Sequence, residues 1–120
     1  MTRVDEHATH VEEAVIPIPR VAGANRAVAW YERLGFLKES EHRFGPGMPA
    51  FVTVARGSVR LLLSEHTGDA RPDTLIYLRV QDVDALAAAL GAEPEDQPWA
   101  REIEVRDPDQ HRPRIGTPRP

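Results

Sequence analysis

The chain has 120 residues, about the length of one domain, and 41% of them are apolar, which is enough for a hydrophobic core. A net charge of −4 with 28% charged residues of both signs argues against a nucleic-acid-binding protein. The absence of Cys excludes disulfides, thiolate nucleophiles and Cys-based metal sites.

The first quarter of the chain predicts an arm, a strand and a helix. Residues 1–12 lack usable periodicity and predict a flexible N-terminal arm. The apolar run at residues 14–19 contains two prolines and predicts a strand that is partly an edge. Asn25 is expected to cap the helix and Gly35 to end it. Its apolar face consists of Ala24, Ala27, Val28, Tyr31 and Leu34.

Three strands are expected next, with a tight hairpin at residues 56–57 joining the last two. They span residues 36–42, 50–55 and 58–65. After a connector, the order of elements begins again. These elements are a strand at residues 74–80, a helix capped by Asp82 and ended by Gly91, a loop at 93–98, a strand at 101–106, a turn at 107–110 and a last strand from His111. Pro113 predicts that the last strand is an edge or bulged.

The two halves share the order strand, helix and further strands. We therefore expect an α+β fold made of two modules, at about residues 13–66 and 73–117, within a single domain at residues 13–120. Each module would form a curved sheet with a helix on one face. The other faces of the two sheets would then form a cupped cleft. No stretch approaches the ~20 apolar residues of a membrane helix. The polar start also differs from a signal peptide, so we expect a cytoplasmic protein.

Catalytic and metal-binding patterns are weak in this sequence. His7 and His10 have helical i, i+3 spacing, but they fall in the predicted arm, which argues against a metal site. His66 and His111 follow the pattern of solvated loop residues. No Ser lies in a nucleophile elbow, and no Gly-rich phosphate loop is present. Carboxylates such as Glu102 and Glu104 alternate along a strand, which favours an ordinary solvated face.

Aromatic side chains are the remaining candidates for recognition. Phe51, Tyr77 and Trp99 lie on or beside predicted strands that would form the cleft walls. Aromatic walls with a few polar groups suit a flat ligand. Packing of the same rings in the core is an equally good reading of the composition. Trp30 and Tyr31 lie in the first helix and are expected in the core.

Several segments together resemble the vicinal oxygen chelate superfamily, which contains glyoxalase I, the extradiol dioxygenases and the fosfomycin- and bleomycin-resistance proteins. AVAWYERLGF at residues 27–36 is similar to the first-helix signature of that superfamily. RDPDQH at residues 106–111 resembles its closing turn. QPWAREIEVRDPD at residues 97–109 and RPDTLIY at 71–77 resemble segments of the bleomycin-resistance proteins. The resemblance extends from about residue 14 to residue 117.

The resemblance implies a fold of paired βαβββ modules, in agreement with the order of elements. It also implies where the metal enzymes of the superfamily place their ligands. In this chain those positions hold Ile16, Leu62, Leu75 and Arg114. Apolar side chains offer no lone pair and Arg stays protonated, so none of the four can ligate a divalent metal. We therefore expect no metal, no cofactor and no catalytic residue.

The superfamily members that sequester antibiotics hold the drug against aromatic side chains in a cleft at a dimer interface. The matching ligand-binding positions here are Glu39, Phe51, Ser64, Tyr77 and Trp99. The resemblance thus implies a homodimeric, non-catalytic protein that confers resistance by binding an antibiotic of the bleomycin type or another aromatic ligand. Two alternatives stay open: a metal-dependent lyase or dioxygenase of the superfamily with an atypical site, and an interaction module without a ligand.

Overall fold

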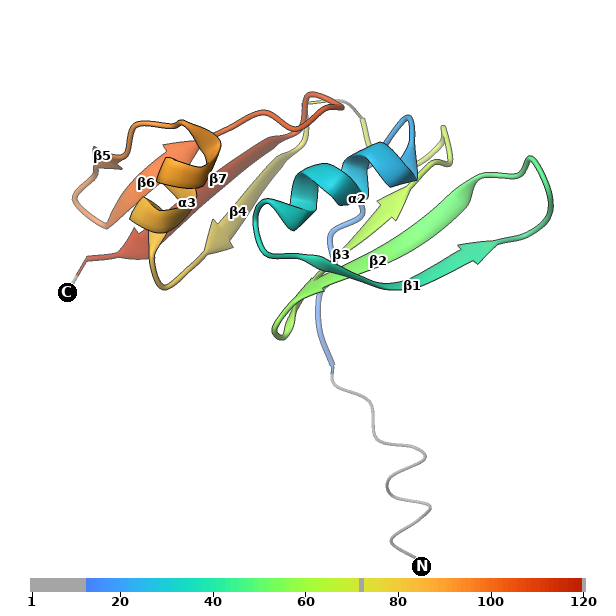
Figure 1. Ribbon diagram of the computed structural model, residues 1–120, viewed down its shortest axis with the longest axis horizontal. Helices are drawn as coiled ribbons and strands as arrows, with labels where there is room; N and C mark the ends of the chain where they lie inside the picture. Colours follow the sequence, from blue (N-terminus) through green and yellow to red (C-terminus); the bar gives the residue numbers. More distant parts are fainter. Residues whose placement is uncertain (1–12, 72, 120) are drawn as a thin grey trace, which may run out of the picture.

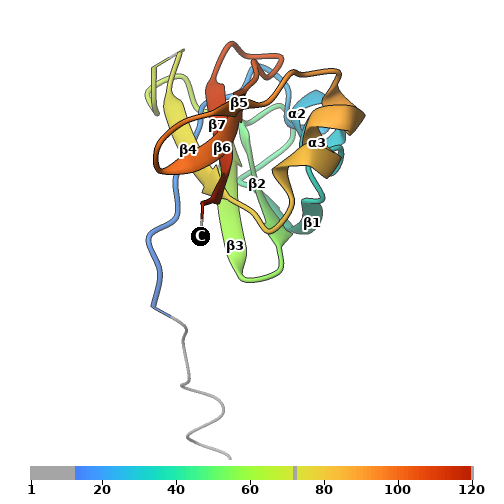
Figure 2. The ribbon, with the colours of Figure 1, turned by 90° about the vertical axis from the view of Figure 1, so that its left-hand side faces the viewer.

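The computed structural model describes residues 13–71 and 73–119. Two modules lie side by side, each with one sheet and one helix (Figure 1). Both helices lie on the same side of the molecule (Figure 2). No helix among the described residues is long and apolar enough to span a membrane.

The first module contains helix α2 and a sheet in the order β1-β2-β3, with both pairs antiparallel. Its elements are α2 (Ala24–Glu32), β1 (Leu37–Arg43), β2 (Ala50–Arg56) and β3 (Val59–Ser64). The pairing of β1 with β2 shifts at Glu39, which forms a bulge. Arg56 pairs with Val59, so the hairpin turns at Gly57 and Ser58, one residue later than expected. Gly57 has a φ of 58°, in the left-handed region that favours Gly.

The expected strand at residues 14–19 does not form; this prediction was wrong. A single parallel bridge, between Arg20 and Ser64, connects this part of the chain to β3. Leu62 and Ser64 donate their backbone N–H groups to the carbonyl oxygens of the segment's two prolines. The prolines can accept these hydrogen bonds but have no N–H to return, so a regular ladder cannot form.

The N-terminus of α2 is capped from a distant part of the chain. Gly23, and not Asn25, is the N-cap residue, and it supplies no side-chain hydrogen bond. Instead, Ala24 donates its N–H to Glu65 Oε2 at 2.8 Å, and Ala50 donates its N–H to Glu65 Oε1 at 2.9 Å. These two backbone donors hold the pKa of Glu65 below its ordinary value. The prediction for Asn25 was therefore wrong.

The second module contains helix α3 and a four-stranded sheet in the order β4-β7-β6-β5. Its elements are β4 (Leu75–Arg79), α3 (Val83–Leu90), β5 (Glu95–Asp96), β6 (Ala100–Glu104) and β7 (Arg112–Pro118). The helix begins and ends as the sequence predicts. Asp82 accepts a hydrogen bond from Ala85 N at 3.1 Å, and Gly91 ends the helix with a φ of 68°. The short β5 lies within the predicted loop.

Pro113 lies in an inner strand, so the expectation of an edge or bulged strand was wrong. β7 pairs with β4 in parallel on one side and with β6 antiparallel on the other. Pro113 is the second residue of β7, at the end of the ladder with β6. Its carbonyl oxygen accepts a hydrogen bond from Val105 N at 3.0 Å. The missing N–H thus falls where the ladder ends, and its loss interrupts no inner pairing.

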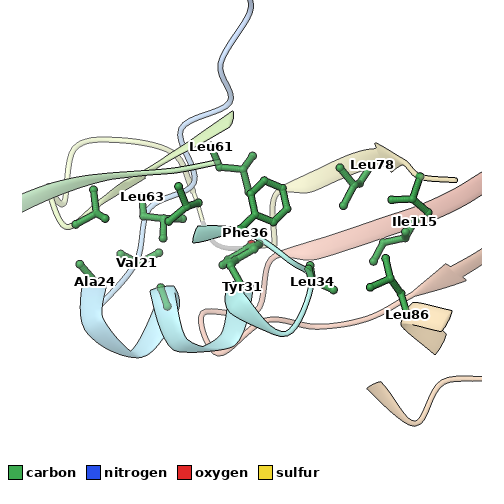
Figure 3. Packing of buried hydrophobic residues seen from close by; sticks show 14 of the residues in the cluster. Val21, Ala24, Tyr31, Leu34, Phe36, Leu61, Leu63, Leu78, Leu86 and Ile115 are labelled. Atoms are coloured by element: carbon green, nitrogen blue, oxygen red, sulfur yellow. The ribbon is translucent and has the colours of Figure 1, made fainter. Parts of the chain in front are cut away.

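The core lies between the helices and the two sheets (Figure 3). It is continuous across both modules and consists of aliphatic side chains with two buried aromatic rings. Its largest buried members include Val21, Tyr31, Leu34, Phe36, Val52, Val54, Leu63 and Ile115. Tyr31 is buried as expected, whereas Trp30 packs against the core and is only partly buried.

A buried polar joint connects the modules. Tyr31 donates its hydroxyl to Asp107 Oδ2 at 2.7 Å, and Asp107 Oδ1 accepts from the N–H groups of Asp109 and His111. The His111 ring accepts from Thr74 N through Nδ1. His111 is fully buried, so its assignment as a solvated loop residue was wrong. These contacts fix the closing turn of the second module against the first.

Candidate ligand-binding site

One face of the second sheet turns away from α3. Strand register places Tyr77, Arg114 and Glu104 in one row across β4, β7 and β6. Gly116 and Glu102 are paired in the next row. Directly opposed residues share a face of the sheet, and successive residues alternate between faces. This open face therefore carries polar and aromatic side chains, while the opposite face supplies Leu78, Ile103 and Ile115 to the core.

Two aromatic side chains on this face share one carboxylate oxygen. Tyr77 donates its hydroxyl and Trp99 donates Nε1–H to Glu102 Oε2, each at 2.8 Å. Trp99 is 62% exposed and Tyr77 is 48% exposed, whereas Glu102 is only 9% exposed. We call these three residues the aromatic clamp. Burial and the hydrogen bond to Glu102 raise the pKa of Tyr77, so its hydroxyl stays a donor.

The clamp depends on a glycine beneath it. A Cβ on Gly116 would overlap the Tyr77 hydroxyl and lie 3.1 Å from Glu102 Cγ. Gly116 has no positive φ, so its backbone conformation does not require Gly. Gly is needed here because there is no room for a side chain. The absence of a side chain at this position allows Tyr77 to reach Glu102 across β7.

A cavity of about 760 Å³ adjoins the clamp. Its wall consists of the end of α2, the segment from the end of α3 to Trp99, residues 102–106 and Arg114. Trp30 lies on the α2 side of this cavity. Arg114 is held by Glu104 at 3.0 Å and Arg106 by Asp73 at 2.8 Å, which leaves Arg33 as a cation on the wall that no described carboxylate pairs with.

The first module holds the other predicted site residues. Phe51 pairs opposite Ser64 on neighbouring strands. Phe51 packs edge-on against Phe44 with ring centroids 6.0 Å apart, and Phe44 packs in the same way against His42 at 4.4 Å. Ser64 is fully buried, and its hydroxyl donates to Asp69 and accepts from His66 N.

Glu39, at the bulge of β1, is bound by Arg60 through both carboxylate oxygens, at 2.9 and 3.0 Å. The five predicted residues therefore fall into two groups on two sheets. Tyr77 and Trp99 are brought together, whereas Glu39, Phe51 and Ser64 do not line the cavity beside the clamp.

Glu102 is the site residue that the sequence reasoning missed. It was expected on a solvated face, and its burial shows that this expectation was wrong. Glu104, on the same face, is partly exposed and binds Arg112 and Arg114. The spacing of Trp99 and Glu102 gives no local signal for the role of the carboxylate. The second donor to Glu102, Tyr77, is 25 residues away in the sequence, and the pairing of β4 with β7 brings it close.

The positions that match metal ligands in the enzymes of the superfamily remain chemically unsuited to a metal. Ile16 and Leu75 are partly exposed aliphatic side chains, and Arg114 is bound by Glu104. Within residues 13–71 and 73–119, no group of three or more His, Cys, Asp or Glu side chains could hold a metal ion. His7 and His10 lie outside the described residues.

A sequence model described as a glyoxalase superfamily protein matches residues 4–111, so the chain belongs to the glyoxalase superfamily. This finding confirms the resemblance of the helix signature and the closing turn. No curated protein matches the chain in sequence.

Solved structures with the same fold include three that are named for drug binding or resistance. The antibiotic-binding protein TnmS3 from Streptomyces sp. CB03234 has a TM-score of 0.70 and 23% identity, over 92% of this chain and 100% of its own. A bleomycin-binding protein complexed with bleomycin has a TM-score of 0.71 and 20% identity, over 90% and 100%. A bleomycin resistance determinant encoded on transposon Tn5 has a TM-score of 0.70 and 21% identity, over 91% and 100%. These matches confirm the α+β fold of paired modules.

Proposed function

We propose that this protein binds a small aromatic molecule against the aromatic clamp and sequesters it without chemical change. The observation that carries the proposal is the sharing of Glu102 Oε2 by Tyr77 and Trp99. The two rings are about half exposed, yet a buried carboxylate fixes their orientation. Exposed rings held in this way form a binding surface that exists before the ligand arrives.

The expected gain from such a surface is large enough to matter. Stacking of a flat heteroaromatic group on an aromatic side chain contributes ~1–3 kcal/mol per ring. Ordering a free side chain on binding costs ~0.5–1.5 kcal/mol, and a side chain that is already hydrogen-bonded avoids much of this cost. The clamp thus favours affinity through pre-organisation as well as contact area.

The ligand class is proposed to be an antibiotic of the bleomycin type or another aromatic compound. Structures of the same fold are described as an antibiotic-binding protein and as a bleomycin-binding protein in complex with its ligand, which supports this class. Binding one ligand per site would lower the free drug concentration in proportion to the amount of protein. Resistance by sequestration requires nothing further from the chain.

A second protomer is proposed to complete the site. Phe44 is 72% exposed beside Phe51 and His42, and these rings form an apolar surface on the first sheet. In a homodimer this surface would face the clamp of the partner and add Phe51 and Glu39 to the binding cleft, whereas Ser64 is fully buried and bound to Asp69, so it would not contact the ligand. The dimer would then place Phe51 and Glu39 on the wall opposite Tyr77 and Trp99.

Tryptophan fluorescence tests the proposal directly. The chain has two Trp residues, and the Trp30→Phe variant leaves Trp99 as the sole reporter. We expect bleomycin, or one of a panel of aromatic antibiotics, to quench this variant saturably at one ligand per protomer. Trp99→Ala, followed by calorimetry, should weaken the same binding at least tenfold. Absence of saturable binding across the panel would refute the proposal. Lyase or dioxygenase activity that a chelator abolishes would favour the metal-enzyme alternative.

A further inference from the structure

A separate cavity of about 290 Å³ lies where the two modules meet. Its walls come from residues 14–17, 58–61 and 76–78, together with Pro113 and three core residues that follow one another along the first module. The core residues are Tyr31, Leu34 and Phe36. In Figure 3 these side chains stand between the strands of the first module and Leu78 of the second. We call this space the seam cavity.

The seam cavity has an apolar wall. Aliphatic and aromatic carbon atoms line it, from residues such as Ile16, Leu34, Phe36 and Ile76. The hydroxyl groups of the two Tyr residues that line it already have partners inside the protein. Tyr31 donates to Asp107, and Tyr77 donates to Glu102.

Arg60, at the rim of the seam cavity, binds Glu39. A polar or charged ligand would therefore lose its hydration here and find few free groups to replace it, which is costly. A neutral, apolar ligand has no strong hydration to lose, and the removal of its surface from water favours binding.

The volume sets the size of the ligand. An apolar protein cavity of ~150 Å³ stays dry and binds benzene. The seam cavity is about twice as large, which suits two fused or linked rings, or a short hydrocarbon chain.

Access to the seam cavity runs past the segment at residues 14–16. Val15 is 95% exposed, and the described contacts first tie this segment to β3 at Pro17, whose carbonyl accepts from Leu62 N. Residues 14–16 thus border the cavity without being held in a sheet. Displacing them breaks few contacts and opens the apolar wall.

We propose that the seam cavity is a second ligand site, which takes a neutral, apolar molecule of one or two rings. It is distinct from the cavity beside the clamp, because Trp99, Trp30 and Glu102 line that cavity and not this one. Tyr77 borders the seam cavity and also belongs to the clamp, through the hydrogen bond of its hydroxyl to Glu102. The proposal does not depend on the antibiotic-binding function.

The test uses Prodan, a neutral dye with two fused rings whose fluorescence increases in apolar surroundings. We expect saturable fluorescence at one dye per protomer with the full chain. Ile16→Phe and Ile76→Phe add volume inside the cavity and should each weaken dye binding at least tenfold. Leu37→Phe is the matched control, because Leu37 is an exposed aliphatic residue on β1 that lines neither cavity. It should stay within twofold of the parent protein.

Two further measurements separate this proposal from its rivals. Trp99→Ala should leave dye binding unchanged, and loss of dye binding in that variant would assign the dye to the clamp and overturn the proposal. Dye affinity should be independent of protein concentration, and a fall with increasing protein would show that a second copy fills the cavity instead. Unchanged binding in both filling variants would also overturn it. Antibiotic titration of the same variants reports separately on the clamp.

Discussion

The two modules have the same order of elements but differ in how their first segment joins the sheet. In the second module, β4 pairs with β7 over five residues, from Leu75 to Arg79. In the first module, the equivalent segment makes one bridge, at Arg20 and Ser64. The difference follows from backbone donors, because the first segment has Pro17 and Pro19 where β4 has residues with N–H groups. One consequence is the loosely covered seam between the modules.

The open faces of the two sheets also differ in how their aromatic rings are held. In the second module, Tyr77 and Trp99 are fixed by hydrogen bonds to a buried carboxylate. In the first, His42, Phe44 and Phe51 contact one another edge to face. Hydrogen bonds to a carboxylate are directional, whereas ring packing permits several arrangements. The second module is therefore the pre-organised half of the proposed site.

The largest effect is expected at the joint between the modules. Asp107→Ala removes the acceptor for the Tyr31 hydroxyl and for the N–H groups of Asp109 and His111. Three buried or partly buried donors would lose their partner, and we expect a loss of about 3 kcal/mol in the free energy of unfolding. Urea denaturation measures it. Asp96→Ala, at an exposed carboxylate, is the control. Equal midpoints for the two variants would show that the joint does not hold the modules together.

The same joint predicts sensitivity to alkali. Burial, followed by the charge of Asp107, raises the pKa of Tyr31 far above its ordinary value of about 10. In the unfolded chain Tyr31 ionises near pH 10, whereas in the folded protein it stays protonated. Stability is therefore fully present below pH ~10 and is lost as the pH rises beyond it. Tyr31→Phe should flatten this part of the stability–pH curve, and an unchanged slope would argue against the assignment.

A smaller effect, confined to ligand binding, is expected at Gly116. Gly116→Val places side-chain atoms where the Tyr77 hydroxyl meets Glu102, so the clamp cannot close. We expect at least a tenfold weaker affinity for the antibiotic, about 1.4 kcal/mol, with a retained fold. Calorimetry gives the affinity and circular dichroism checks the fold. Gly23→Ala is a matched control, because a Cβ there meets nothing within 4 Å.

The distant cap of α2 gives the next effect. Glu65→Gln keeps the shape of the side chain but removes the charge that accepts from Ala24 and Ala50. We expect a loss of about 1 kcal/mol at neutral pH. The pKa of Glu65 is lowered in the folded protein, so its contribution is present above pH ~4.3 and is lost as the pH falls through the folded value. The two proteins should converge in urea titrations at acid pH, and a difference that stays constant at every pH would contradict this role of Glu65.

Local signals predicted the helix of the second module well. Asp82 and Gly91 define α3 because a side-chain cap and a left-handed glycine act within one turn of the helix. Asn25 failed as a cap because Glu65, 41 residues away, supplies the acceptor for the first turn. A sequence pattern indicates the local preference of a residue, but it does not show which residues the fold brings close from elsewhere in the chain.

The site shows the same division between local and distant information. Trp99 and Tyr77 were chosen through family resemblance, and the structure places them on one carboxylate. Glu102 was overlooked because its alternation with Glu104 looks like an ordinary solvated strand face. Its burial is produced by the neighbours that β4 and β7 bring to it. His111 was misread for the same reason, since Thr74 and the first module enclose it.

The smallest effect is expected on the wall that the first module would supply. Glu39 has both carboxylate oxygens bound by Arg60, so a ligand cation must share them or displace Arg60. Glu39→Gln should therefore change the antibiotic affinity by no more than about twofold, since exposed ion pairs contribute little. Phe51→Ala removes a ring from the same wall and should weaken binding more, though less than Trp99→Ala. Isothermal titration of the three variants ranks them. A tenfold loss in Glu39→Gln with no change in Phe51→Ala would place the ligand along β1, and the first module would then be the dominant wall.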